Sequence, residues 1–152
     1  MFFLKELPTR QMLDRYSERF TEMDVEKTNN ALVLLRTASV LMRQLDRYFE
    51  QFDLSQSKVL IMIMLDREPG KPTLTMKELS DRLDISKPVL TRTLSALVKK
   101  NYVQTTASDK DGRQKLNRLT DRGQKKLYAI IPGYHEILKG VNYECRPGKN
   151  PA

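Results

Sequence analysis

Hydrophobic residues recur at helical spacing through most of the chain and predict a mainly helical protein. In the first half, this spacing predicts one helix over Pro8–Phe20 and a long one over Val25–Gln51. A third helix, Gln56–Asp66, carries the longest apolar run and is expected to form core. The last helical pattern starts at Thr120 and resumes after Pro132–Gly133, which predicts a kink or a break at that point.

The long helix is apolar around more than one face. Leu34, Ala38, Leu41 and Leu45 form one stripe, and further apolar residues beside it widen this stripe. A helix of this kind needs cover from outside its own domain. We therefore expect a dimer interface here, and the alternative is an ordinary buried core helix.

The stretch Thr75–Leu97 reads as two short helices joined by a tight turn. Thr75 and Glu78 have the spacing of a capping box, in which each side chain bonds the other's backbone N–H. Ser86 is a suitable N-cap for the second helix, and Pro88 falls in its first turn, where a missing N–H costs nothing. The pattern predicts a helix-turn-helix.

A β-hairpin is predicted after the second of these helices. Tyr102–Ala107 is rich in strand formers, Ser108–Gly112 has turn composition, and Arg113–Leu119 can return as the partner strand. Thr73–Thr75 is a candidate third short strand beside them. A helix-turn-helix followed by a hairpin with a basic tip is a winged helix-turn-helix.

The second helix of the motif has two chemically different faces. Leu90, Leu94 and Leu97 form its inner stripe. The opposite face carries short hydroxyls and long cations, which suit a helix lying in a DNA major groove, where such side chains reach phosphates and base edges. These residues are Ser86, Lys87, Thr91, Arg92 and Ser95.

The positive charge is concentrated on the same region. The chain has a formal net charge of +8. Residues 71–126 hold 14 Lys or Arg against 6 Asp or Glu, and the remaining residues hold 13 of each sign. This distribution is typical of a polyanion-binding face. A solvated basic surface without a partner is the alternative.

Several other classes of protein are not indicated. One cysteine, Cys145, allows no intrachain disulfide and suits a reducing cytoplasm. The longest apolar run is too short to span a bilayer, so no membrane partner is expected. The lone histidine, His135, has no Cys/His cluster near it in sequence, and Asp109 and Asp111 read as turn formers. We therefore expect no metal, no cofactor, no catalytic residue and no enzyme.

The central motifs resemble the multiple-antibiotic-resistance regulator (MarR) family. The stretch Ser86–Val103 is followed at the expected separation by the run Asp109–Gly123, with sequence DKDGRQKLNRLTDRG. The family's wing pattern is matched by an acidic and basic tip and by a Leu-Thr-x-x-Gly segment, and the likeness covers roughly Leu54 to Lys126. The matching residues are Asp109, Asp111, Arg113, Leu119, Thr120 and Gly123.

The resemblance implies a fold and a function. The expected fold is mainly α with a small β-hairpin wing, a winged helix-turn-helix flanked by N- and C-terminal dimerisation helices. The expected segments are 1–53 for dimerisation, 54–126 for DNA binding, and 127–152 for a C-terminal dimerisation helix and tail. We expect a homodimeric regulator that binds a pseudo-palindromic double-stranded operator, usually as a repressor. The expected DNA contacts are Thr75, Lys77, Ser86, Lys87, Pro88, Val89, Thr91, Arg92, Ser95, Lys110 and Arg113.

Two positions depart from the family pattern. Asn101 stands where relatives usually have glycine at the end of the second helix, and Asn is the next best residue for positive φ. Ser95 and Ala96 replace an Asp-Arg pair whose carboxylate can brace the wing arginine, here Arg113. Arg113 therefore lacks that partner: either Asp109 or Asp111 orients it, or it is freer in the unbound protein, and its expected DNA-binding role is unchanged.

The resemblance also implies an effector, commonly a small aromatic anion bound between the dimer helices and the winged domain. Aromatic residues of the N-terminal helices could line such a crevice, although aromatics at this spacing more often form core: Tyr16, Phe20, Tyr48, Phe49 and Phe52. Two other functions stay open. An architectural protein would bind DNA without sequence preference, and a protein-interaction module would show no salt-dependent DNA binding.

Overall fold

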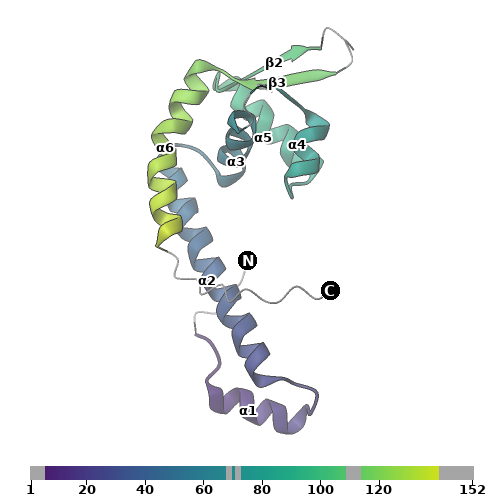
Figure 1. Ribbon diagram of the computed structural model, residues 1–152, viewed down its shortest axis with the longest axis vertical. Helices are drawn as coiled ribbons and strands as arrows, with labels where there is room; N and C mark the ends of the chain where they lie inside the picture. Colours follow the sequence, from purple (N-terminus) through teal and green to yellow (C-terminus); the bar gives the residue numbers. More distant parts are fainter. Residues whose placement is uncertain (1–5, 68–69, 71–72, 109–113, 141–152) are drawn as a thin grey trace. The chain divides into compact units, whose positions relative to one another are not determined.

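The computed structural model (Figure 1) describes residues 6–67, 70, 73–108 and 114–140. Lys110 and Arg113 lie outside these residues. The described chain forms two compact units, one up to residue 45 and one over residues 46–140. The predicted assignment of 1–53, 54–126 and 127–152 to dimerisation and DNA binding stays a prediction.

The first unit contains α1, Arg10–Arg19, and most of α2, Val25–Glu50. Both helices lie within two residues of their predicted bounds, since their apolar spacing is regular. Thr9 caps α1 by accepting a hydrogen bond from the Met12 N–H at 3.3 Å. Arg10 forms ion pairs with Asp14 at 3.2 Å and with Glu26 at 3.5 Å, so it links α1 to the start of α2.

The end of α2 turns into α3, Gln56–Asp66, through a residue with positive φ. Asp53 has φ 58°, the Asp53 N–H bonds the Glu50 carbonyl, and the Leu54 N–H bonds the Phe49 carbonyl at 3.1 Å, which together close a Schellman motif. Lys100 forms an ion pair with Asp53 and also donates to its carbonyl oxygen at 3.2 Å. This hydrogen bonding from Lys100 lowers the pKa of Asp53 below its usual value.

The second unit is the winged helix-turn-helix. Its helices are α3, α4 (Met76–Arg82) and α5 (Lys87–Lys99), which lie together beside the hairpin (Figure 1). The turn between α4 and α5 falls at the predicted residues. The helix α3 begins and ends at the predicted residues. Apolar side chains from all three helices and from the first strand meet in one core, and each of the following is at most 1% exposed: Val59, Ile61, Met62, Leu74, Leu79, Leu90 and Leu97.

A three-stranded antiparallel sheet completes this unit. Its strands are β1 (Leu74–Thr75), β2 (Val103–Ala107) and β3 (Lys115–Leu119), in the order β1-β3-β2. β3 pairs with β2 from Val103↔Leu119 to Ala107↔Lys115, and with β1 at Leu74↔Asn117. The prediction of a wing hairpin with a third short strand is therefore confirmed, as is the mainly helical fold class.

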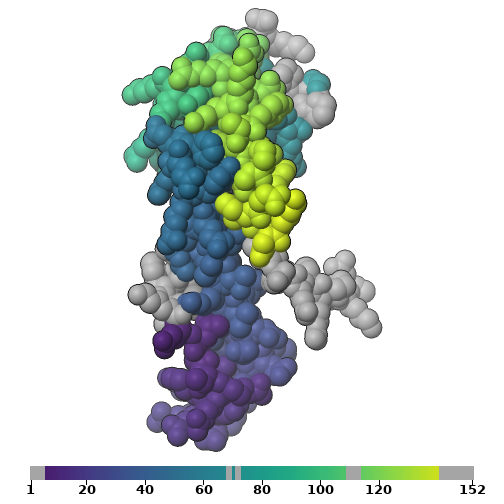
Figure 2. All heavy atoms as spheres, turned by 90° about the vertical axis from the view of Figure 1, so that its left-hand side faces the viewer, coloured from purple at the N-terminus to yellow at the C-terminus, as the bar shows by residue number. Residues whose placement is uncertain are grey.

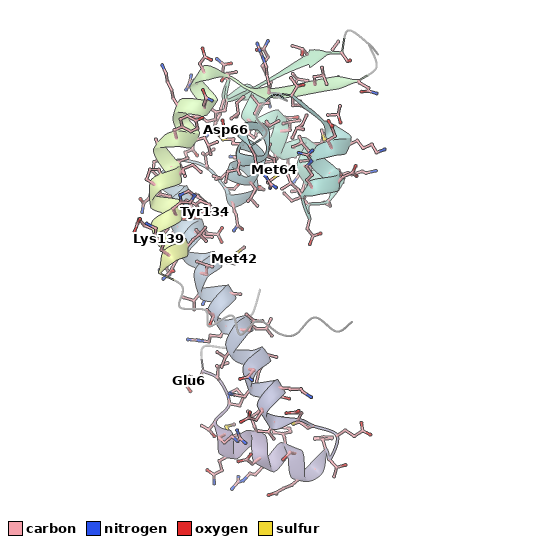
Figure 3. The ribbon with its side chains drawn as sticks, in the orientation of Figure 1. Glu6, Met42, Met64, Asp66, Tyr134 and Lys139 are labelled. Carbon is pink, nitrogen blue, oxygen red and sulfur yellow. The ribbon has the colours of Figure 1, made fainter. Side chains whose placement is uncertain are left out.

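The last helix, α6, runs from Asp121 to Lys139 without interruption. Of the predicted kink or break at Pro132–Gly133, the break is wrong, and the kink stays a prediction. Packing on both sides of the proline holds the helix together: the Tyr48 hydroxyl donates to the Ile130 carbonyl at 2.8 Å, and the rings of Phe49 and Tyr134 lie 5.8 Å apart. Figure 3 shows Tyr134 pointing from α6 toward α2, and Figure 2 shows α6 on the surface in green and yellow.

Glycine at position 133 makes this contact possible. A Cβ added at Gly133 would lie 2.3 Å from the Tyr48 hydroxyl oxygen. The residue that signalled a helix break in the sequence therefore provides space for an aromatic ring from the end of α2. Proline still removes one intrahelical hydrogen bond, and the tertiary contacts compensate for that loss.

Candidate nucleic-acid interface

The centre of the candidate interface is α5. Ser86 is its N-cap residue, with extended φ and ψ, and Pro88 occupies the first turn. One side of the helix is buried through Leu90, Leu94 and Leu97. These three side chains hold the helix against the core and leave its opposite side exposed.

The end of α5 also follows from its sequence. Asn101 has φ 56°, as expected for a residue that replaces glycine. Its N–H bonds the Val98 carbonyl at 2.9 Å, and the Tyr102 N–H bonds the Leu97 carbonyl at 3.0 Å. This Schellman motif turns the chain directly into β2, so the wing begins at a defined angle to the helix.

The outer face of α5 carries the residues predicted to enter the major groove. All of them are exposed, and they form one surface that includes an apolar Val89, 44% exposed. Lys87–Lys99 contains no Asp or Glu. The surface is therefore positive and free of groups that would repel phosphate; its members are Ser86, Lys87, Pro88, Val89, Thr91, Arg92 and Ser95.

Most polar groups on this face are not used by the fold. Ser86 makes no side-chain capping bond, although it occupies the N-cap position. Within the described part of the chain, the side chains of Lys87 and Arg92 have no hydrogen bond or ion pair. Thr91 differs, because its hydroxyl donates to the Lys87 carbonyl at 2.9 Å. Among the described residues, the face thus presents two cations and the hydroxyls of Ser86 and Ser95 to an external ligand.

The start of α4 is held by a capping box. The Thr75 hydroxyl accepts from the Glu78 N–H at 3.2 Å and donates to the Glu78 carboxylate at 2.9 Å. The Glu78 carboxylate in turn accepts from the Thr75 N–H at 2.8 Å, which completes the predicted capping box. Thr75 is half-buried and engaged in this way, whereas Lys77 beside it is exposed.

The described strands of the wing add two residues that sequence reasoning did not single out. Arg118 donates to the Gln104 side-chain oxygen at 3.1 Å across the β2–β3 pair. Both side chains are exposed. Because side chains alternate along a strand, the positions of Arg118 and Gln104 on the outer face follow from the register, which the sequence alone did not supply. The expected lack of an Asp brace for Arg113 stays a prediction, because Arg113 lies outside the described residues.

The Leu-Thr-x-x-Gly segment fastens α6 to the end of α5. Thr120 is the N-cap of α6: its hydroxyl accepts from the Gly123 N–H at 3.0 Å and donates to the Asn101 carbonyl at 2.7 Å. A Cβ at Gly123 would lie 2.0 Å from the Tyr102 carbonyl oxygen. Glycine is required because the helix lies directly against the backbone between α5 and β2.

Other predicted residues take structural positions. Phe49 is 1% exposed and lies in the core, as expected for an aromatic at helical spacing, and Tyr48 and Phe52 contact each other edge to face at 5.1 Å. Tyr16 and Phe20 stack at 6.2 Å in the first unit. His135 is exposed and lies 5.8 Å from the Tyr134 ring.

Neither a metal-ion cluster nor a membrane-spanning helix occurs among the described residues. No group of three or more His, Cys, Asp or Glu residues is placed to hold a metal ion there. None of the helices in that part of the chain is both long and apolar enough to cross a membrane.

Comparison with known proteins agrees with this geometry. Residues 52–114 match the MarR family. The chain is 24% identical to the HTH-type transcriptional repressor YetL of Bacillus subtilis over 139 residues, which are 91% of this chain and 82% of YetL.

Solved structures show the same fold. The MarR family transcriptional regulator AbsC of Streptomyces coelicolor superposes with a TM-score of 0.71 at 19% identity, over 77% of this chain and 78% of AbsC. Sco3205 from the same organism, a MarR family regulator solved in complex with DNA, gives a TM-score of 0.71 at 22% identity over 77% and 73%.

The family match agrees with the expectation of a regulator rather than an enzyme. It falls on the winged helix, where the sequence motifs and the outer face of α5 also lie. The segment 52–114, which forms the winged helix, therefore matches the MarR family of transcriptional regulators, as its motifs predicted.

Proposed function

We propose that this protein is a sequence-specific double-stranded DNA-binding regulator that acts as a homodimeric repressor on a pseudo-palindromic operator. The observation that carries the proposal is the outer face of α5, which is free of acid and presents Lys87 and Arg92 without a partner among the described residues. Two relatives support the proposal of a DNA-binding repressor: YetL is named a repressor, and Sco3205 was solved with DNA.

Each residue of the face has a role in a major groove. Arg92 contacts a guanine edge or a phosphate, because guanidinium matches both bidentately. Pro88 and Val89 contact a thymine methyl group, and the Ser86 hydroxyl and Lys87 contact phosphates. Thr91 and Ser95 line the same groove. At the start of α4, beside Thr75, Lys77 contacts the DNA backbone.

The wing extends these contacts to the flanking minor groove. Lys110 and Arg113 are proposed to reach phosphates or a narrow A·T-rich groove, which attracts arginine. They lie outside the described residues, and the support is their place in the hairpin between β2 and β3. Arg118, exposed on β3, adds charge on the same hairpin.

The dimer is supported by apolar surface on the first unit. Only Leu13, Ser39 and Leu45 are buried among its described residues. Two such units, pressed together through α2, remove this surface from water and place two recognition helices about 34 Å apart, one turn of DNA. The exposed apolar residues are Met12, Tyr16, Phe20, Val33, Leu34, Leu35, Val40 and Met42.

Two finer features complete the proposal. A cytoplasmic location is supported by the DNA target and by the single cysteine in the sequence. Release by a small aromatic anion is supported only by the family likeness. Such a ligand acts if it binds one spacing of the recognition helices more tightly than the other.

Selection of genomic fragments by the purified protein, followed by a salt titration on the best fragment, tests the proposal. The expected result is an enriched palindrome whose log affinity falls with log salt by about 0.9 per phosphate contacted. Binding without enrichment would support an architectural protein instead. No binding at low salt would mean that the basic face serves a protein partner.

Arg92→Ala tests the central contact. It should weaken operator binding by about 1–3 kcal/mol, because a bidentate base contact is lost. Arg15→Ala removes an exposed arginine from α1 and serves as the control, with unchanged affinity expected. Equal affinity of the Arg92 variant and the parent would remove Arg92 from the groove.

A further inference from the structure

Asn117 is a fully buried polar residue at the centre of the small sheet, with 1% of its surface exposed. Its side-chain N–H donates to the Leu74 carbonyl on β1 at 3.0 Å. Its side-chain oxygen accepts from the Thr105 hydroxyl on β2 at 2.8 Å. One side chain on β3 therefore joins all three strands.

Burying the side-chain amide of an asparagine in a protein core carries a free-energy cost. A buried amide is costly unless its donor and acceptor both find partners, and an apolar side chain would avoid that requirement. What the amide adds is specificity. If β3 slipped by one residue, Asn117 would turn outward and Arg118 would turn toward the core, so the two hydrogen bonds favour a single register.

The two partners of Asn117 belong to different functional parts. Leu74 directly precedes Thr75, the N-cap of α4, so the first bond reaches the start of the helix-turn-helix. Thr105 is in the middle of β2 and directly follows Gln104, which holds Arg118 on the outer face. The amide thus connects the wing to the helix pair that presents α5.

We propose that Asn117 is a positioning residue that holds the wing at a fixed orientation to the helix-turn-helix, so that wing and recognition helix engage one DNA site together. This inference rests on the proposed DNA-binding function. A loosened wing loses its contacts with flanking DNA, whereas the base contacts of α5 at the centre of each half-site remain.

Thr105→Val and Thr105→Ser form a matched pair for the test. Valine has the same shape but no hydroxyl, so the bond to Asn117 is lost while the Asn117–Leu74 bond remains; serine retains the hydroxyl. Affinity is measured at one salt concentration on two duplexes, the full selected operator and a version shortened to the base pairs under α5. The parent protein should bind the full duplex more tightly.

Thr105→Val should reduce that flank-dependent gain by about three- to ten-fold, the factor expected for one hydrogen bond, with unchanged affinity for the short duplex. Thr105→Ser should keep the gain. Asn117→Asp, which cannot donate to Leu74 when ionised, should lose it as well. A Thr105→Val variant that keeps the full gain would overturn the proposal, and so would an equal loss on both duplexes.

Amide hydrogen exchange separates this proposal from the proposed function. Thr105→Val should speed exchange in β2 and β3 and leave α3 and α5 as protected as in the parent. If the parent binds no duplex, the proposed function fails, and exchange alone decides whether Asn117 holds the wing. Unchanged exchange in the strands would then overturn the positioning role.

Discussion

The N-terminal helices and the winged helix treat their apolar side chains in opposite ways. In the winged helix, residues such as Ile61, Leu90 and Leu97 are fully buried. In the first unit, Leu13 and Leu45 are the buried apolar residues among those described, and Leu34 and Leu35 are 45% and 50% exposed. The winged helix has a core of its own, whereas the described residues of the first unit leave many apolar side chains exposed.

The charges show the reverse contrast. In the first unit, Arg10 pairs with Asp14 and Glu26, and Lys27 pairs with Asp24. On α5, Lys87 and Arg92 have no pairing side chain among the described residues. One region is thus neutralised and apolar, and the other is cationic and polar. The proposal of two kinds of partner, a second protein chain and a polyanion, rests on this difference.

The largest predicted effect would break the contrast in burial. Leu97→Ala should lower the free energy of unfolding by about 2–5 kcal/mol, because it leaves a cavity in a packed core. Leu35→Ala should change the unfolding of the isolated chain by no more than about 0.5 kcal/mol, since the side chain is half exposed. Urea unfolding followed by circular dichroism measures both.

Protein concentration provides the control for this pair. If α2 covers its apolar face with a second chain, Leu35→Ala should raise the dimer dissociation constant in sedimentation experiments, and Leu97→Ala should destabilise the protein at every concentration. A loss for Leu35→Ala as large as that for Leu97→Ala, and independent of concentration, would show that the first unit has its own core.

Local signals explain how much of this fold was predictable. The capping pair Thr75 and Glu78 and the bounds of α3 depend on residues within one helical turn, and both were predicted correctly. The outer face of α5 was predictable for the same reason, because helical spacing fixes which side chains share a face. The positive φ at Asn101 was expected from the family resemblance and is also confirmed.

Long-range contacts explain what the sequence did not supply. Pro132 predicted an interruption that Tyr48, about eighty residues away in the chain, helps to prevent. The role of Asn117 depends on Leu74 and Thr105, which only the strand register brings together. The need for Gly123 likewise comes from the backbone of Tyr102. None of these pairs has a signature within a short window.

A smaller effect on stability is predicted within the winged helix. It separates side chains that stabilise the fold from side chains that are proposed to bind DNA. Thr75→Ala should destabilise the protein by about 0.5–2 kcal/mol, because the capping box is lost. Ser86→Ala should stay within about 0.5 kcal/mol, since Ser86 makes no capping bond, yet it should weaken operator binding. Equal destabilisation by both variants would mean that Ser86 caps α5 in solution.

The smallest predicted effect tests the contrast in charge. It is measured as the salt dependence of DNA affinity rather than as the affinity at a single salt concentration. Lys87→Ala should reduce the slope of log affinity against log salt by about 1, because one phosphate contact and its released counterion are lost. Lys27→Ala is the matched control: it removes a lysine that is exposed and paired with Asp24 at 3.1 Å. Its slope should equal that of the parent. If both variants lower the slope equally, the slope reports net charge, and the unpaired cations on α5 have no special part in binding DNA.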